Sequence, residues 1–251
     1  MKKRYFLYFS YNGKAYHGWQ MQPNGISVQE VLMRCVSTIL RTETELTGAG
    51  RTDTGVHAKT MVAHFETENS FVADPAFVIK LNSMLPHDIA CSKVLEVQPD
   101  AHARFDAISR RYEYHIVTQK DVFLKDLAVR MPNPLDFAAM NIAAEKLLHY
   151  TDFTSFSKLH TDVKTNNCDV KSAQWHQIDA HRWYFSIEAD RFLRNMVRAI
   201  VGTLFDVGRA KLTVEQFEQV IQAKNRCQAG ASVPAHGLYL VDIVYPEELF
   251  V

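Results

Sequence analysis

The order of the apolar segments in the first third of the chain is the feature that most constrains its fold. Aromatic residues fill both faces of the segment 4–11, as they do in a strand inside a sheet. Apolar residues recur at helical spacing from 28 to 39 and predict an amphipathic helix. The other predicted elements of this third are a short strand around 44–50 that runs into a glycine-bearing loop, strands at 61–67 and 91–97, and a helix at 75–84. This β-α-β-β-α-β order is that of the split βαβ, or ferredoxin-like, unit.

Two of these helices carry sequence signals for their first turn. Ser27 is followed three residues later by Glu30, which is the pattern of a capping box. Asp74 is followed by Pro75, the pattern of an aspartate N-cap with proline at the first helical position. Both helices are therefore expected to begin at defined residues.

The remaining residues predict a looser version of the same alternation. Its predicted elements are strands at 110–117, 171–178, 182–189 and 238–245, and helices at 135–149, from Phe192 and from Thr213. We expect an α+β fold of two ferredoxin-like halves, residues 1–105 and 106–251. The halves would share a mixed, mainly antiparallel sheet, with helices on one side and a central active-site cleft.

Charge is balanced over the whole chain but not along it. The 28 basic and 28 acidic residues exclude a polycation that holds nucleic acid through bulk charge. Residues 1–29 nevertheless contain four basic and no acidic residues, and residues 182–211 contain six basic and three acidic ones. These segments can form a basic face that binds phosphates.

The cysteines and the amino-terminal stretch indicate the compartment. The four cysteines are far apart and form no CxxC pair, which favours free thiols over a zinc or redox site. The apolar stretch after the first basic residues alternates and is too short for a signal peptide or a membrane span. We expect a soluble cytoplasmic protein with no membrane association.

The segment GAGRTDTGVHA, residues 48–58, brings a carboxylate, a cation and an imidazole into one glycine-rich loop. These groups are Asp53, Arg51 and His57. The simplest interpretation is an Asx-type turn between two strands. Asp-Thr-Gly also occurs in aspartic proteases, but those pair two such tripeptides and this chain has one. A P-loop is excluded because no Lys-Ser/Thr follows the glycines.

The segment FLRNMVRAIVGTLFDVG, residues 192–208, predicts a helix with one buried side. A second stripe along the predicted helix consists of Arg191, Arg194, Asn195, Arg198 and Gly202. Because arginines at this spacing repel one another, the stripe either faces an anionic partner or is a solvated face paired with Glu188 and Asp190. A glycine in mid-helix costs up to about 1 kcal/mol relative to alanine, so Gly202 predicts close packing against another backbone.

The segment RRYEYHI belongs to the strand predicted at 110–117. Tyr112 and Tyr114 point to the same side of such a strand, which favours two core aromatics. A basic pair beside an aromatic ring is also the composition of a base-stacking platform. The residues themselves leave both interpretations open, with the core interpretation favoured.

Together these segments resemble the tRNA pseudouridine synthase A family nearly from end to end. The matching segments are YNGKAYHGWQ with SVQEVL, GAGRTDTGVHA, ARFDA with RRYEYHI, DFTSF, FLRNMVRAIVGTLFDVG and VPAHGLYL. The resemblance implies an isomerase that converts uridine to pseudouridine at positions 38, 39 and 40 of the tRNA anticodon arm. It implies no cofactor and no metal, and it implies a homodimer.

The resemblance also assigns roles to residues. Asp53 matches the catalytic aspartate, Arg198 the arginine that pairs with it, and Tyr112 the tyrosine that stacks on the target base. Arg51 matches the residue that enters the space left by a flipped-out nucleotide. The other expected substrate-binding residues are Leu238, Arg194 and Arg111.

His57 is expected to shape the loop rather than to carry out acid-base chemistry.

The residues leave two other classes of function open. A non-catalytic protein that binds structured RNA would keep the basic stripe but would not need Asp53. An aspartic protease would need two Asp53 loops brought together in a dimer.

Overall fold

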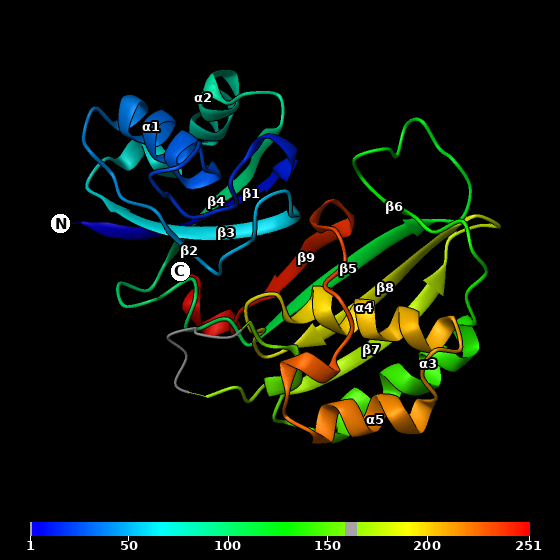
Figure 1. Ribbon diagram of the computed structural model, residues 1–251. Coiled ribbons are helices and arrows are strands. Elements are labelled where there is room, and N and C mark those ends of the chain that lie inside the picture. Colours follow the sequence, from blue (N-terminus) through cyan, green and yellow to red (C-terminus); the bar gives the residue numbers. More distant parts are fainter. Residues whose placement is uncertain (1, 159–164) are drawn as a thin grey trace. The chain divides into compact units, whose positions relative to one another are not determined.

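The computed structural model describes residues 2–158 and 165–251 and divides the chain into two compact units. Unit 1 consists of Met1–Ile108 and Tyr239–Val251, and unit 2 of Ser109–Leu238. Both units are mixed α+β with mostly antiparallel strands, as expected (Figure 1). The first border lies three residues from the expected one, whereas the last residues of the chain belong to unit 1 instead of the second half.

Unit 1 is built on a sheet in which β1 lies between β3 and β4. Its elements are β1 (Lys3–Tyr11), α1 (Val28–Leu40), β2 (Thr47–Gly48), β3 (His57–Thr67), α2 (Pro75–Met84), β4 (Ile89–Val97) and most of β9 (Leu238–Val244). β1 is antiparallel to β3 and β4, and β2 is antiparallel to β3. β9 is parallel to β3 through the pair His57 and Tyr239. Helices α1 and α2 lie on one face of this sheet (Figure 1).

The expected helix starts in unit 1 are confirmed. The Oγ of Ser27 accepts a hydrogen bond from the N–H of Glu30 at 3.2 Å. The carboxylate of Asp74 accepts one from the N–H of Ala76 at 2.8 Å, with Pro75 at the first helical position. Such caps satisfy amides that the helix itself leaves without partners.

The carboxyl-terminal segment covers part of β1, which explains why it belongs to unit 1. Phe6 is fully buried, and its ring centroid lies 4.9 Å from that of Tyr245 and 6.3 Å from that of Phe250. Phe9, also buried, stacks on Trp19 at 5.3 Å. The expectation that β1 is covered on both faces is therefore correct, since residues 5–9 are all buried.

Unit 2 contains a three-stranded antiparallel sheet in the order β5, β8, β7, with the short β6 parallel to β5. Its elements are β5 (Ser109–Val117), β6 (Val129–Arg130), α3 (Phe137–Glu145), β7 (Val170–Gln177), β8 (Arg182–Ala189), α4 (Met196–Gly208) and α5 (Val214–Gln222). The three helices contact one another, and α3 also contacts β7. In the described parts of both units, no helix combines the length and the apolar character needed to cross a membrane.

The prediction of an arginine stripe along α4 is wrong. The helix was expected from Phe192, but it begins at Met196 because Asn195 has the left-handed backbone conformation, with φ 67° and ψ 3°. Asn195 is held there by a hydrogen bond from its side-chain amide to Ser232 Oγ. Arg191 and Arg194 thus precede the helix, and only Arg198 lies on it.

The prediction for Gly202 is confirmed. A Cβ on this residue would lie 1.9 Å from the carbonyl oxygen of Ala231. The neighbouring Gly230 donates its N–H to Thr203 Oγ1 at 2.9 Å, so the segment around Ala231 is fastened to the helix. Gly202 is the residue that lets this backbone lie directly against α4.

Candidate active site

The loop of residues 48–58 joins β2 to β3 and carries Asp53. The N–H of Val56 donates to the carbonyl of Asp53 at 3.1 Å, which closes a tight turn. Gly55 has a φ of 78° in this turn, a conformation that glycine adopts without a Cβ clash. The side chain of Asp53 is half-buried and that of Arg51 is exposed. A defined backbone therefore holds a partly accessible carboxylate.

The segment after β1 fixes the carboxyl end of this loop. The N–H of Gly13 donates to His57 Nδ1 at 3.0 Å, and a Cβ on Gly13 would lie 1.9 Å from the carbonyl oxygen of Val56. The imidazole of His57 is 2% exposed and stacks on Tyr239, with ring centroids 4.6 Å apart. Because Nδ1 accepts a hydrogen bond, the proton of the neutral ring is on Nε2. These contacts agree with the expectation that His57 shapes the loop.

The same segment fixes the middle of the loop at Thr52. Gly18 has a φ of 85°, and a Cβ on it would lie 2.3 Å from the Thr52 carbonyl oxygen. The N–H of Trp19 donates to that carbonyl at 3.3 Å, and the Thr52 hydroxyl lies 2.8 Å from the hydroxyl of Tyr11. Gly13 and Gly18 thus let two backbone segments meet on either side of Asp53. The loop is preorganised by contacts distant in sequence.

Arg198 of unit 2 is held by the chain segment that precedes β9. Its Nε donates to the carbonyl of Val233 at 2.7 Å, and its own carbonyl accepts from the N–H of Val233 at 3.2 Å. The first bond holds the guanidinium by its Nε–H, and the second holds the backbone of Arg198 to the same residue. The half-buried Arg198 therefore presents a cation in a defined orientation.

The next residues of that segment hold Tyr114 on β5. The hydroxyl of Tyr114 donates to the carbonyl of Pro234 at 2.9 Å, and a Cβ on Gly237 would lie 2.9 Å from the tyrosine ring. Burial raises the pKa of Tyr114, and the nearby charge of Arg198 lowers it by a smaller amount. The segment VPAHG thus connects α4 to β5, a positioning role that its sequence did not reveal.

Tyr112 and Tyr114 differ in their surroundings although both were predicted for one side of the strand. Tyr114 is fully buried, as the core interpretation requires. Tyr112 is half-buried, and Phe192 packs edge-on against its ring with centroids 5.0 Å apart and planes at 83°. This contact at nearly a right angle holds the plane of the tyrosine ring relative to that of Phe192.

The expected site residues fall into both units. Arg51 and Asp53 belong to unit 1, whereas Arg111, Tyr112, Arg194, Arg198 and Leu238 belong to unit 2. Arg111 and Arg194 are exposed, and Leu238 is buried at the start of β9. Among the described residues no group of three or more His, Cys, Asp or Glu side chains could hold a metal ion.

Comparison with known proteins identifies the family. The model of a family described as tRNA pseudouridine synthase matches residues 143–246. A tRNA pseudouridine synthase A from Bacteroides fragilis is 57% identical over 248 residues, which cover 99% of this chain and 98% of the relative. Proteins of the same name from Parabacteroides distasonis and Porphyromonas gingivalis are 56% and 53% identical, each over 249 residues; these cover 99% and 98% of this chain, and 98% and 99% of those relatives. With such identity along its whole length, the chain belongs to the tRNA pseudouridine synthase A family, a family of isomerases.

Proposed function

We propose that this chain converts uridine to pseudouridine at positions 38, 39 and 40 of the tRNA anticodon stem-loop. In this isomerisation the C1′–N1 bond breaks, the uracil turns, a C1′–C5 bond forms, and the proton leaves C5 while N1 gains one. Family membership supports the reaction class. The observation that carries the assignment of the site is the half-buried Asp53 on a loop that Gly13 and Gly18 hold in place.

Asp53 acts as the nucleophile. A carboxylate can split a difficult transfer into two steps by forming a covalent intermediate, here by adding either to the pyrimidine ring or to the ribose C1′. Either path needs the carboxylate ionised and aimed. The backbone contacts at Thr52 and Val56 supply the aim.

Arg198 pairs with Asp53, and Tyr112 stacks on the target base and assists removal of the C5 proton. An adjacent guanidinium stabilises the ionised form of a carboxylate in a partly dry pocket. The bond from Nε to Val233 supports this role, because it orients the planar guanidinium before any substrate arrives. The edge contact from Phe192 likewise supports a fixed ring plane for Tyr112.

Arg198→Lys is expected to keep tRNA binding but to lower kcat by at least about tenfold. Lysine keeps the charge, but its single ammonium cannot donate to Val233 and also present a planar, bidentate cation. Arg209→Lys is the control, since Arg209 is an exposed arginine just after the same helix. Steady-state tritium release from tRNA containing 5-tritiated uridine measures both variants. A wild-type kcat for Arg198→Lys would refute the role given to the guanidinium.

Substrate recognition follows from the same assignment. A uridine in a duplex cannot reach a carboxylate, so the nucleotide is flipped out, and Arg51 enters the space it leaves. Arg111, Arg194 and Leu238 contact the tRNA around the site. The anticodon arm is recognised by its shape, through phosphates and 2′-hydroxyl groups, because one site must accept three neighbouring positions.

The proposed enzyme works as a cytoplasmic homodimer. Each of its two α+β units has a ferredoxin-like, split βαβ core. A dimer would double the basic surface of a chain that carries no net charge. Sedimentation velocity at micromolar concentration is expected to give a dimer, and a single monomeric species would contradict this part of the proposal.

A further inference from the structure

The loop of residues 101–107, which contains the ARFDA segment, has no role in the chemistry above. It follows β4 and carries an aromatic residue, Phe105, that is 73% exposed. Single exposed apolar residues are common and need no function. This one differs because the loop beneath it is tightly ordered by hydrogen bonds.

The backbone of the loop is folded around His102. The N–H groups of Arg104 and Phe105 both donate to His102 Nδ1, at 3.1 and 3.4 Å. The N–H of His102 donates to the carboxylate of Asp106 at 2.7 Å, and the N–H of Asp106 donates back to the carbonyl of His102 at 3.1 Å. These bonds define the backbone position of Phe105 before any partner binds.

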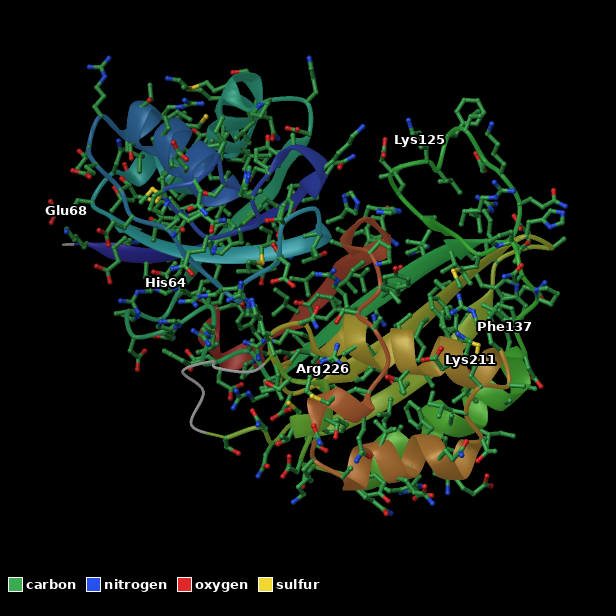
Figure 2. All side chains as sticks on the ribbon, viewed as in Figure 1. His64, Glu68, Lys125, Phe137, Lys211 and Arg226 are labelled. Atoms are coloured by element: carbon green, nitrogen blue, oxygen red, sulfur yellow. The ribbon has the colours of Figure 1, made fainter. Side chains whose placement is uncertain are left out.

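Three further residues anchor the loop to the rest of unit 1. His64, labelled in Figure 2, lies on β3 and accepts the N–H of Ala103 at its Nδ1, at 3.1 Å. The hydroxyl of Tyr245 donates to the carbonyl of Ala103 at 2.6 Å, and Arg4 donates to the carbonyl of Ala101 at 2.9 Å. The loop is thus fixed to β1, β3 and the end of the chain.

The rings form a continuous series from the interior to the surface. The centroid of His64 lies 4.6 Å from that of His102, and His102 lies 4.3 Å from Phe105 at an angle of 36°. Burial lowers the pKa of His64 to about 4 and also lowers that of His102. Both imidazoles are therefore neutral near pH 7, as their acceptor roles require. At the outer end, the guanidinium carbon of Arg104 lies 5.7 Å from the centre of the Phe105 ring.

We propose that Phe105 and Arg104 form a contact site for tRNA, in which an unpaired nucleobase stacks on the Phe105 ring and Arg104 binds an adjacent phosphate. This inference rests on the proposed function, since it assumes a tRNA substrate. An aromatic face beside a cation is the combination that proteins use to hold single-stranded nucleotides. Preorganisation of the ring lowers the entropy cost of binding.

A second copy of the chain is the competing occupant of this surface. The residues next to Phe105 favour RNA, because Arg104, His102 and Asp106 are polar or charged, whereas the core of an interface between copies is usually apolar. The carboxylate of Asp106 would repel phosphates, but it accepts the N–H of His102 and so belongs to the loop framework. The site holds RNA away from the reacting atoms and should therefore affect binding more than turnover.

Equilibrium binding of unmodified tRNA to Phe105 variants tests the proposal. Phe105→Ala is expected to raise Kd about tenfold, because base stacking on an aromatic ring contributes roughly that much. Phe105→Leu should weaken binding nearly as much, since it keeps apolar area but lacks a π face, and Phe105→Tyr should bind like the wild type. Ile79→Ala is the matched control, because Ile79 on α2 is 72% exposed in the same unit.

Tritium-release kinetics on the same proteins separate this inference from the proposed function. We expect KM to rise with Kd in Phe105→Ala while kcat changes little. Wild-type turnover together with unchanged Kd for Phe105→Ala and Phe105→Leu would overturn the contact site alone. A wild-type chain that binds tRNA but releases no tritium would overturn the proposed function instead. A change in sedimentation of Phe105→Ala with unchanged tRNA affinity would assign the surface to a second copy and overturn the inference.

Discussion

Asp53→Asn is expected to reduce tritium release from 5-tritiated tRNA by at least about a thousandfold, while tRNA still binds. Asparagine has nearly the same shape, so the turn closed by the Asp53 carbonyl and the Val56 N–H remains possible. Its amide is not a nucleophile, so the covalent step is lost; a thousandfold corresponds to about 4 kcal/mol of transition-state stabilisation. Single-turnover kinetics with excess enzyme measure this step directly.

The matched control for Asp53→Asn is Asp100→Asn. Asp100 is an exposed aspartate in the same unit, so this change removes the same charge without touching the loop. We expect it to release tritium like the wild type. If Asp53→Asn also did so, Asp53 would not be the nucleophile and the site would have to be sought elsewhere.

Gly202→Ala is expected to destabilise unit 2 although alanine is the better helix former. Intrinsic propensity favours alanine by up to about 1 kcal/mol in mid-helix. Its methyl group, however, would lie 1.9 Å from the carbonyl oxygen of Ala231, and backbone on both sides must then move. Overpacking of this kind costs about 2 kcal/mol or more, so the sign of the propensity effect is reversed.

Thermal unfolding measures that change, with Gly50→Ala as the control. Because a Cβ on Gly50 would meet nothing within 4 Å, the thermal unfolding midpoint of Gly50→Ala should change little. For Gly202→Ala we expect a midpoint lower by several degrees, since about 1 kcal/mol corresponds to roughly 2–4 °C in a chain of this size. An unchanged or higher midpoint would show that the segment 229–233 does not press against α4.

Local signals predicted many of the elements because those elements depend on neighbouring residues. Ser27, Asp74 and Thr213 mark the starts of α1, α2 and α5, and the side chain of each accepts a hydrogen bond from an N–H of the first turn. β3 begins at His57, earlier than predicted. The prediction missed its first residues because they lack the apolar alternation of 61–67. The late start of α4 depends on the backbone conformation of Asn195, which periodicity does not encode.

Contacts between distant segments were the least predictable part of the fold. Nothing local in the last residues shows that Tyr245 and Phe250 pack on Phe6, so the carboxyl-terminal strand was assigned to the other half. β6 is two residues long and has no sequence signal.

The site shows the same division between local and distant information. The glycine-rich composition around Asp53 indicated close backbone approach, and that is what Gly55 and the turn provide. The partners of the loop, Gly13 and Gly18, are more than thirty residues away, and only the resemblance placed their segment in the same family pattern. Likewise, the bond from Arg198 to Val233 spans 35 positions and has no local signature.

The central claim is that this chain makes pseudouridine in the anticodon arm, and position-specific labelling tests it most directly. tRNA transcripts carrying 5-tritiated uridine only at position 38, 39 or 40 are incubated with the wild-type chain, beside transcripts labelled only in another arm. The account predicts release of tritium from uridines at 38, 39 and 40 and none from the other arm. No release from these three positions by folded, tRNA-binding protein, or release only from the other arm, would contradict it.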